Sequence, residues 1–337
     1  MELPWSVGAA TGVGSLPYDD RDEAARVVVG ELADFPHLPE LPSRGAGADM
    51  VGRAAALLVD MHVDLQPSGW RLVDRPGRDE KRAEAMLRAD LDALEIAAHG
   101  YEGPLKVQVA GPWTLAAGLD RTRGDRVLAD FGARRDLAQS LAEGVAEHLT
   151  DVARRLPGAR VVVQIDEPTL PAVLAGAIPT SSGFGRLRAV DPTEVESLLA
   201  TVLRASGKWA LLHCCAASVP VALAQRAGAV AVSFDVGVID GETVDQLAEC
   251  VDGGELALWP GVVPVLPPAA GSSDTDLAER VERLWRRLDQ DPSAAAVRTV
   301  VTPACGLAGA DPSWVRSAYT LVRGTAKAFA ESVGATG

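Results

Sequence analysis

The chain has 337 residues, of which 47% are hydrophobic and 23% charged, a composition typical of a globular protein with a large core. Its formal net charge of −14 argues against nucleic acid or an anionic membrane surface as a binding partner. No apolar run approaches the ~20 residues that a helix needs to span a bilayer, so a membrane protein is not expected.

The four cysteines do not have the spacing of a disulfide framework. Cys214 and Cys215 are adjacent, whereas Cys250 and Cys305 lie far from them along the chain. Residues 1–5 also lack the basic and apolar regions of a secretory signal. We therefore expect the protein in the reducing cytoplasm, where thiolates remain free to bind a metal.

Strand-like apolar runs alternate with helix-like stretches from one end of the chain to the other. Eight strands are expected, at residues 10–17, within 35–42, and at 105–110, 160–165, 209–212, 229–234, 256–259 and 299–301. The main helices are expected at residues 22–32, 49–61, 78–98, 134–156, 192–205, 275–289 and 312–329, with a short insertion around 69–73. This alternation predicts a parallel (β/α)8 barrel that occupies residues 1–337 as a single domain.

A doubly wound sheet is the alternative fold that the same alternation allows. Such a fold often carries a dinucleotide-binding G-x-G-x-x-G motif after its first strand. Here Gly12-Val13-Gly14 is followed by Ser-Leu-Pro, so the third glycine of the motif is missing. The barrel is therefore the favoured fold.

Residues that can bind a ligand or take part in catalysis follow most of the expected strands. In a (β/α)8 barrel the active site lies at the carboxyl ends of the strands. The residues found at those positions are Gly14-Ser15, Glu40, Gly111-Pro112, Asp166-Glu167, His213, Cys215, Asp235 and Cys305. We expect the functional site among them.

An imidazole and two thiols are the strongest signal in this set. His213 and Cys215 form an H-x-C pair at the end of an apolar run; if the strand continues to Cys215, period-two alternation puts both side chains on one face and Cys214 on the other. Cys305 follows a later strand, and three such ligands with one open position are typical of catalytic zinc. Buried packing is the alternative for each residue taken alone. Asp235 is either an oxygen ligand or a carboxylate that orders its loop, and both interpretations stay open.

A pair of carboxylates, Asp166 and Glu167, ends the expected strand at 160–165. Asp166 is interpreted as a group that binds a substrate ammonium or performs acid–base chemistry. An ion pair between strands is the alternative. Glu167 stays undecided, because on a continuing strand its side chain points to the opposite face.

The segment Val13-Gly14-Ser15 offers backbone N–H groups close to the expected site. Glycine lets a ligand approach the backbone closely, so the segment is a candidate for binding a substrate carboxylate, with a simple tight turn as the alternative. The other histidines have no matching partner and are interpreted as surface or capping residues: His37, His62, His99 and His148.

Five motifs occur in a fixed order along the chain: G-S-x-P (14–17), G-P-x-T (111–114), Q-I-D-E-P (164–168), H-x-C (213–215) and P-x-C-G-L (303–307). Together they resemble the C-terminal catalytic domain of cobalamin-independent methionine synthase, within the superfamily that includes uroporphyrinogen decarboxylase. The resemblance spans residues 11–329. It implies a (β/α)8 barrel in which zinc binds the homocysteine thiol as a thiolate and presents it to a methyl donor.

The resemblance also implies roles for individual residues. Four zinc ligands are implied: His213, Cys215, Cys305 and, where the family has a glutamate, Asp235. Asp166, together with Glu40, would hold the amino group of the amino acid substrate. The carboxylate of that substrate would bind the segment Val13, Gly14 and Ser15.

Two features of the family's folate-dependent members are missing. Those enzymes carry a histidine after the seventh strand that protonates the departing folate nitrogen, and residues 260–267 contain none. They also carry a tryptophan that stacks on the pterin, and the matching offset here falls on Gly118. Activation of the thiol is therefore expected to be kept, and folate handling to be lost.

The expected function is a zinc-dependent methyl transfer to homocysteine that gives methionine, from a donor other than polyglutamyl folate. Methylcobalamin, free or on a corrinoid partner protein, is attractive as the donor because its leaving group needs no proton. Two alternatives remain: another zinc-dependent thiol alkyltransferase on the same barrel, and a non-catalytic zinc- or thiol-binding homologue.

Overall fold

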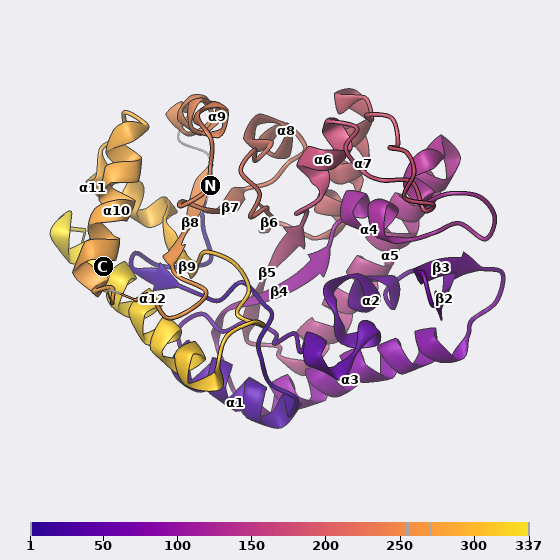
Figure 1. Cartoon of the computed structure of the whole chain (residues 1–337). Helices are drawn as coiled ribbons and strands as arrows, with labels where there is room; N and C mark the ends of the chain where they lie inside the picture. The colour runs from indigo at the N-terminus through magenta and orange to yellow at the C-terminus, as the bar shows by residue number, and fades with distance from the viewer. Residues whose placement is uncertain (1, 254–255, 270, 336–337) are drawn as a thin grey trace.

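The computed structural model describes residues 2–253, 256–269 and 271–335, and its centre is a curved parallel sheet of seven strands (Figure 1). The strands lie in the order β1-β9-β8-β7-β6-β5-β4, so each strand from β4 to β8 pairs with the next one along the chain, and β9 also pairs with β1. Their bounds are β1 (Ala9–Ala10), β4 (Gly103–Ala110), β5 (Ala159–Asp166), β6 (Ala210–His213), β7 (Ala231–Asp235), β8 (Ala257–Val263) and β9 (Val300–Pro303).

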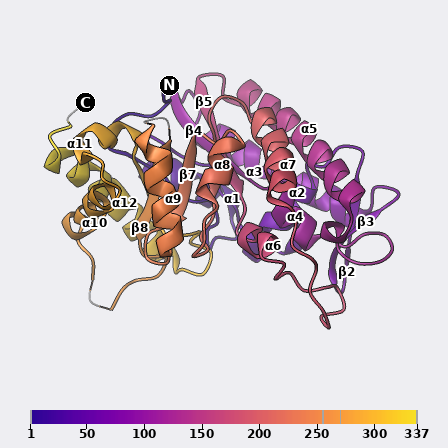
Figure 2. The ribbon, with the colours of Figure 1, turned by 90° about the horizontal axis from the view of Figure 1, so that it is seen from above.

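Helices cover the outer face of this sheet, as Figures 1 and 2 show. Many begin after an aspartate whose carboxylate accepts a hydrogen bond from an amide of the first turn, as Asp20 does at α1 and Asp311 at α12. Their bounds are α1 (Arg21–Glu31), α2 (Met50–Ala55), α3 (Arg78–Ala97), α4 (Pro112–Gly118), α5 (Phe131–Arg155), α6 (Leu170–Leu174), α7 (Pro192–Ala205), α8 (Val221–Arg226), α9 (Gly241–Asp252), α10 (Asp274–Arg287), α11 (Pro292–Ala295) and α12 (Pro312–Ser332). Short 3-10 turns lie at η1 (Pro42–Arg44), η2 (Ala46–Ala48), η3 (Val127–Ala129) and η4 (Ala296–Arg298).

The expected second strand does not form a regular strand. Residues 36–40 are held by two isolated parallel bridges, one between His37 and Lys106 of β4 and one between Glu40 and Ser15. Prolines at 36, 39 and 42 have no N–H to donate, which prevents a continuous ladder. The expected first strand, 10–17, is likewise reduced to β1. The predicted (β/α)8 barrel is thus present as an α/β fold with a seven-stranded curled sheet and these two bridges.

The region after α2 also differs from the prediction. The helix expected at 49–61 ends at Ala55, and Asp60 has a positive φ of 57°, which a helix does not allow. The insertion expected around 69–73 is one half of an antiparallel hairpin, β2 (His62–Gln66) with β3 (Gly69–Val73). In Figure 2 this hairpin lies beside the loops that follow the carboxyl ends of the central strands.

The inward-facing side chains near the amino ends of the strands form a compact apolar cluster, which we call the apolar plug. Its members are Trp5, Ala9, Phe35, Val162, Leu211, Ala231, Ala257, Trp259 and Val300. The Trp259 ring lies 5.3 Å from the Trp5 ring and 5.5 Å from the Phe35 ring, both in edge-on contacts. The plug therefore closes the interior of the curved sheet from one end.

Toward the carboxyl ends of the strands the same inward-facing rows become polar, and we call these residues the polar layer. They are Lys106, Gln108, Gln164, Asp166, His213, Ser233 and Thr302, and all are buried. The strand register aligns Gln108 with Gln164, Asp166 with His213, and His213 with Ser233, so each pair shares a face. Because buried polar groups need partners, this layer is where ligand chemistry is expected.

None of the helices in the described part of the chain is both long enough and apolar enough to cross a membrane.

Candidate active site

A cavity of about 400 Å³ opens above the polar layer, at the carboxyl ends of the strands. It brings together seven residues that the sequence analysis singled out: Val13, Ser15, Glu40, Asp166, His213, Cys215 and Cys305. Met50 and Asp49 at the start of α2 form part of its wall. Residues separated by nearly 300 positions in the sequence thus line one space, as the barrel prediction required.

The imidazole and the two thiols form a compact group inside this cavity. Ligand atoms of His213, Cys215 and Cys305 all lie within 4.8 Å of one another. The two sulfur atoms are 3.2 Å apart, which is too long for a disulfide, and all four cysteines of the chain are free. His213 ends β6, and Cys305 follows β9, so different strands supply the group.

The donor atoms of this group fit a zinc ion. His213 is buried, its Nδ1 is hydrogen-bonded to Ser233 Oγ at 2.9 Å, and its Nε2 has no hydrogen-bond partner among the described residues. A buried ring nitrogen without a partner is costly unless a ligand takes it, and a hydrogen bond at the other ring nitrogen is the usual support for a metal-binding histidine. Contact with Cys215 and with His213 lowers the pKa of the Cys305 thiol to about 4, despite burial. A nitrogen and two sulfur atoms form a typical donor set for zinc.

Asp235 does not join this group in the described structure. Its Oδ1 accepts a hydrogen bond of 2.7 Å from the Gly237 amide, so it orders the loop after β7. Its pKa is raised, first by burial and then by the negative charge of Cys305. The charge of Cys305 thus acts on the Asp235 carboxylate. The compact group itself consists of His213, Cys215 and Cys305.

Asp166 lies at the end of β5, beside His213 in the strand register. Its side chain is buried and accepts a hydrogen bond of 2.6 Å from Gln164 Nε2. Burial raises the pKa of Asp166 to about 7, while the nearby His213 and Lys106 act in the opposite direction. No arginine or lysine of the described chain forms an ion pair with it, so a cationic ligand group would meet a carboxylate that has no strong partner.

Glu167 points away from the cavity, as strand alternation predicted. Its carboxylate accepts hydrogen bonds from the Trp113 amide at 2.8 Å, the Thr114 amide at 2.7 Å and the Thr114 hydroxyl at 2.6 Å. These contacts hold the first turn of α4 against the end of β5. Glu167 therefore has a structural role, which settles the choice left open for it.

Glu40 reaches the cavity from the extended segment that replaces the second strand. Arg53 of α2 approaches it, with Nε 3.6 Å from Glu40 Oε1, and also forms an ion pair with the buried Asp90 of α3. Burial raises the pKa of Glu40, and the Arg53 and Lys106 charges oppose this. Unlike Asp166, this carboxylate already has a cationic partner.

The segment from Val13 to Ser15 forms one wall of the cavity. Within the described chain, the amide N–H groups of Val13, Gly14 and Ser15 donate no hydrogen bond, whereas the Gly14 carbonyl accepts one of 3.1 Å from the Glu40 amide. Successive unpaired N–H groups are a common feature of anion sites. Gly306, which follows Cys305, packs on this wall so closely that a Cβ there would lie 2.0 Å from Ser15 Oγ.

Three inward-facing residues below the cavity were missed by the sequence analysis: Lys106, Gln108 and Gln164. The signal was present, because β4 alternates between apolar and polar residues and a barrel strand is buried on both faces. Polar residues on such a strand face the interior, and here they lie below the cavity. Lys106 is the largest of these residues and is fully buried.

Two of the histidines interpreted as surface or capping residues are instead buried. His37 Nε2 is hydrogen-bonded to the Tyr319 hydroxyl at 2.8 Å, and burial lowers the His37 pKa to about 3. His148 on α5 is also buried, and burial lowers its pKa to about 4. Both are neutral core residues, which the local sequence did not reveal. His62 and His99 lie nearer the surface.

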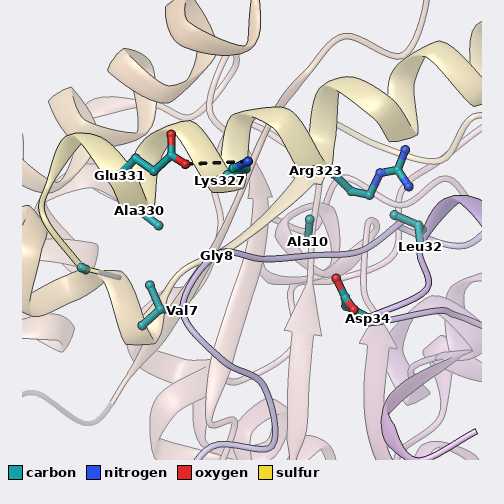
Figure 3. Close-up of a pocket in the computed structure, with 10 residues that line it drawn as sticks. Val7, Gly8, Ala10, Leu32, Asp34, Arg323, Lys327, Ala330 and Glu331 are labelled. Atoms are coloured by element: carbon teal, nitrogen blue, oxygen red, sulfur yellow. Dashed lines mark ion pairs between the residues drawn. The ribbon is translucent and has the colours of Figure 1, made fainter. Parts of the chain in front are cut away.

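A second cavity, of about 390 Å³, lies beside the start of β1 and is drawn in Figure 3. Its polar residues are charged side chains of α12 and the loop after α1: Asp34, Arg323, Lys327 and Glu331. Lys327 and Glu331 form an ion pair of 3.8 Å across one turn of α12. Among the described residues no histidine or cysteine lines this cavity, so it offers no donor set like that of His213, Cys215 and Cys305.

Comparisons with known proteins match the chain to one family and to a solved structure of similar fold. The family described as "Cobalamin-independent synthase, Catalytic domain" matches residues 8–328. Among solved structures, a B12-independent methionine synthase from Shewanella sp. W3-18-1, in complex with selenomethionine, is 12% identical with a TM-score of 0.64, over 98% of this chain and 100% of that chain. A GH5_18 protein from Streptomyces cattleya in complex with Manb1-4GlcNAc is 17% identical with a TM-score of 0.41, over 97% of this chain and 80% of that chain. No curated protein matches the sequence.

The Shewanella structure supports the fold, since it aligns over nearly the full length of both chains. The family match carries the assignment, because it covers almost all of the sequence and includes every residue of the cavity. The chain therefore belongs to the family of the cobalamin-independent synthase catalytic domain.

Proposed function

We propose that this protein is a zinc-dependent methyltransferase that moves a methyl group to the thiol of homocysteine to give methionine. We further propose that its methyl donor is methylcobalamin or a methylated corrinoid protein, and not polyglutamyl folate. The observation that carries the proposal is the compact group of His213, Cys215 and Cys305 beside the unpaired carboxylate of Asp166. The family of the chain supports a methyltransferase of the methionine synthase type.

Zinc held by His213, Cys215 and Cys305 would keep the substrate thiol in its nucleophilic thiolate form at neutral pH. Ser233 supports this arrangement because it fixes the ring of His213 through Nδ1. The four free thiols of the chain suit a reducing compartment, and we propose the cytoplasm.

The remaining walls of the cavity suit the amino acid part of homocysteine. Asp166 is buried and forms no ion pair with an arginine or lysine of the described residues, so it would bind the ammonium group, with Glu40 beside it. The unpaired N–H groups from Val13 to Ser15 would bind the carboxylate. The Shewanella protein is described in complex with selenomethionine, a selenium analogue of the product proposed here.

The donor side lacks the groups that folate chemistry needs. No histidine, aspartate or glutamate occurs in residues 260–273, which cover the end of β8 and the loop that follows it, and of which residue 270 lies outside the described residues. Gly118 ends α4, and a Cβ there would touch Val51, so this position offers no aromatic surface for a pterin. Loss of a general acid typically costs ~10²–10⁴-fold in rate. A corrinoid donor avoids this loss because its leaving group needs no proton.

The test supplies zinc-replete protein and saturating homocysteine with one donor at a time. The donors are methylcobalamin, methyltetrahydrofolate and its polyglutamyl form, and methionine formed per minute is measured. We expect methylcobalamin to be faster than either folate by about 10²-fold or more.

Three results would change this proposal. Fast turnover with methyltetrahydrofolate would contradict the donor assignment. Binding of homocysteine without turnover from any donor would favour a non-catalytic thiol-binding protein. Alkylation of other thiols in preference to homocysteine would favour a different thiol alkyltransferase.

A further inference from the structure

Lys106 is a fully buried lysine directly below the candidate active site. The other lysines of the chain, Lys81, Lys208 and Lys327, are all exposed. Burying an ammonium group is costly unless charges or hydrogen bonds compensate for the lost water. Burial lowers the Lys106 pKa to about 8, while the carboxylates of Asp166 and Glu40 act to raise it. The carboxylates of Asp166 and Glu40, which line the candidate active site, thus stabilise the charged form of Lys106.

The contacts of Lys106 converge on one carbonyl group of the cavity wall. Its Nζ donates to the Val13 carbonyl at 2.7 Å and to Gln108 Oε1 at 3.0 Å. Gln164 Nε2 donates to the same Val13 carbonyl at 3.0 Å and to Asp166 Oδ1 at 2.6 Å. Two side chains on neighbouring strands therefore fix the orientation of the Val13 peptide group.

The geometry of a peptide unit links this carbonyl to the ligand side. In a planar trans peptide the C=O of Val13 and the N–H of Gly14 point in opposite directions. Because the carbonyl points to Lys106, the Gly14 N–H points away from it. A cation at the carbonyl also polarises the peptide and strengthens the N–H as a donor. Val13 and Ser15 line the cavity on either side of this group.

The negative charge of the cavity wall gives Lys106 a second role, which is to offset the repulsion of a substrate carboxylate. Three carboxylates line the wall, those of Glu40, Asp49 and Asp166, and no lysine or arginine lines it. Such a wall attracts an ammonium group but repels a carboxylate. Arg53 is already paired with Glu40 and Asp90. Lys106 is the buried cation that can offset this repulsion from behind the Val13–Ser15 segment.

We propose that Lys106 is a positioning residue that makes an acid-lined cavity accept the carboxylate of an amino acid thiol. It does so by orienting and polarising the Val13–Gly14 peptide and by adding a positive charge behind it. This inference rests on the proposed function, because it concerns how the same site selects its substrate. According to this proposal, Lys106 determines which thiols bind although it does not line the cavity.

The experiment measures binding of three thiols to zinc-replete protein by titration calorimetry. Homocysteine has both end groups, 4-mercaptobutanoate has only the carboxylate, and 3-mercaptopropylamine has only the amine. In the Lys106→Met variant we expect homocysteine and 4-mercaptobutanoate to bind at least about tenfold more weakly, because the Val13–Gly14 peptide loses the cation that orients and polarises it. Binding of 3-mercaptopropylamine should stay within twofold or become tighter, because the wall becomes more negative.

Two further variants keep the test interpretable. Lys106→Gln removes the charge and retains an N–H donor, so it should show the same order of effects at smaller size; it also serves if the methionine variant does not fold. Lys208→Met makes the same chemical change at an exposed site near the amino ends of the strands, and it should change nothing. Zinc content, measured in each protein, should equal that of the unmodified chain.

A loss of affinity limited to the thiols that carry a carboxylate distinguishes a positioning role of Lys106 from a general disruption of the site. Equal weakening of all three thiols in Lys106→Gln and Lys106→Met would overturn the proposal, as would homocysteine binding within twofold of the unmodified protein. If the unmodified chain bound none of the thiols, the proposed function itself would be refuted, and the role of Lys106 with it. The unmodified protein therefore tests the function, and the variants test the residue.

Discussion

Two cavities of similar volume, about 400 and 390 Å³, lie at opposite ends of the strands and differ in what lines them. In the first, buried side chains from several strands converge, and the Nε2 atom of His213 has no partner among the described residues. In the second, drawn in Figure 3, the charged side chains belong mainly to α12, and those of α12 form ion pairs, Arg323 with Glu31 and Lys327 with Glu331. The difference teaches that volume does not mark a site, whereas the convergence on one cavity of potential metal-donor side chains from several strands does.

The interior of the curved sheet shows the same division. The apolar plug at the amino ends is filled by aromatic and aliphatic side chains in contact with one another. The polar layer at the carboxyl ends keeps buried charges at a cost in stability. We therefore expect substitutions in the plug to change stability, and substitutions in the polar layer and around the cavity to change ligand binding.

Replacement of one thiol gives the largest expected effect. Cys305→Ser should lose most of the bound zinc, because a serine hydroxyl is a much poorer ligand than a thiolate and only two protein donors of the group remain. Elemental analysis after expression in zinc-replete medium measures this. Cys250→Ser, on α9 and away from the group, is the matched control and should keep the metal. No zinc in the unmodified protein would refute the metal assignment.

A substitution in the apolar plug should lower stability and leave zinc binding unchanged. Trp259→Ala should lower the free energy of unfolding by about 3–5 kcal/mol, because it leaves a large void among fully buried rings. Chemical denaturation measures the loss, and the folded fraction should keep its zinc. Trp209→Ala, at the half-exposed edge of the plug, should cost less. A variant that kept full stability but lost zinc would contradict the separation of the two regions.

Removal of the negative charge of Asp166 should affect one end of the substrate. Asp166→Asn should weaken homocysteine at least tenfold, because a buried charged hydrogen bond is worth roughly 1.5–3 kcal/mol. Titration calorimetry with homocysteine and with its deaminated analogue, 4-mercaptobutanoate, measures the contribution of the amine. Equal affinity of the unmodified protein for the two thiols would count against the assignment.

The smallest effect is expected in the second cavity. Lys327→Met removes an exposed charge from α12 and one ion pair within that helix. Such surface changes usually alter stability by less than about 0.5 kcal/mol. Zinc content, thiol binding and the unfolding transition should therefore match those of the unmodified chain. A marked loss of methyl transfer in this variant would show that the second cavity serves the reaction.

Much of the fold followed from local pattern. The six strands from β4 to β9 lie within a few residues of their predicted positions, because an apolar run between turn residues is a local signal. The H-x-C pair could be interpreted from alternation on a strand that continues to Cys215; β6 in fact ends at His213, but Cys215 still lies beside His213 in the compact group. Cys214 accordingly lies in the outer hydrophobic core, away from the zinc-ligand candidates.

The sequence by itself determined the class of fold, the residue types of the candidate zinc group and the family of the chain. Only the tertiary structure decided that Cys215 and Cys305 lie 3.2 Å apart, that Glu167 supports α4, and that Lys106 lies below the cavity. It also reduced the second strand to two bridges and left Asp235 outside the compact group. The physical reason is that these outcomes depend on how distant strands meet when the sheet curls, whereas period and residue type are properties of each strand alone.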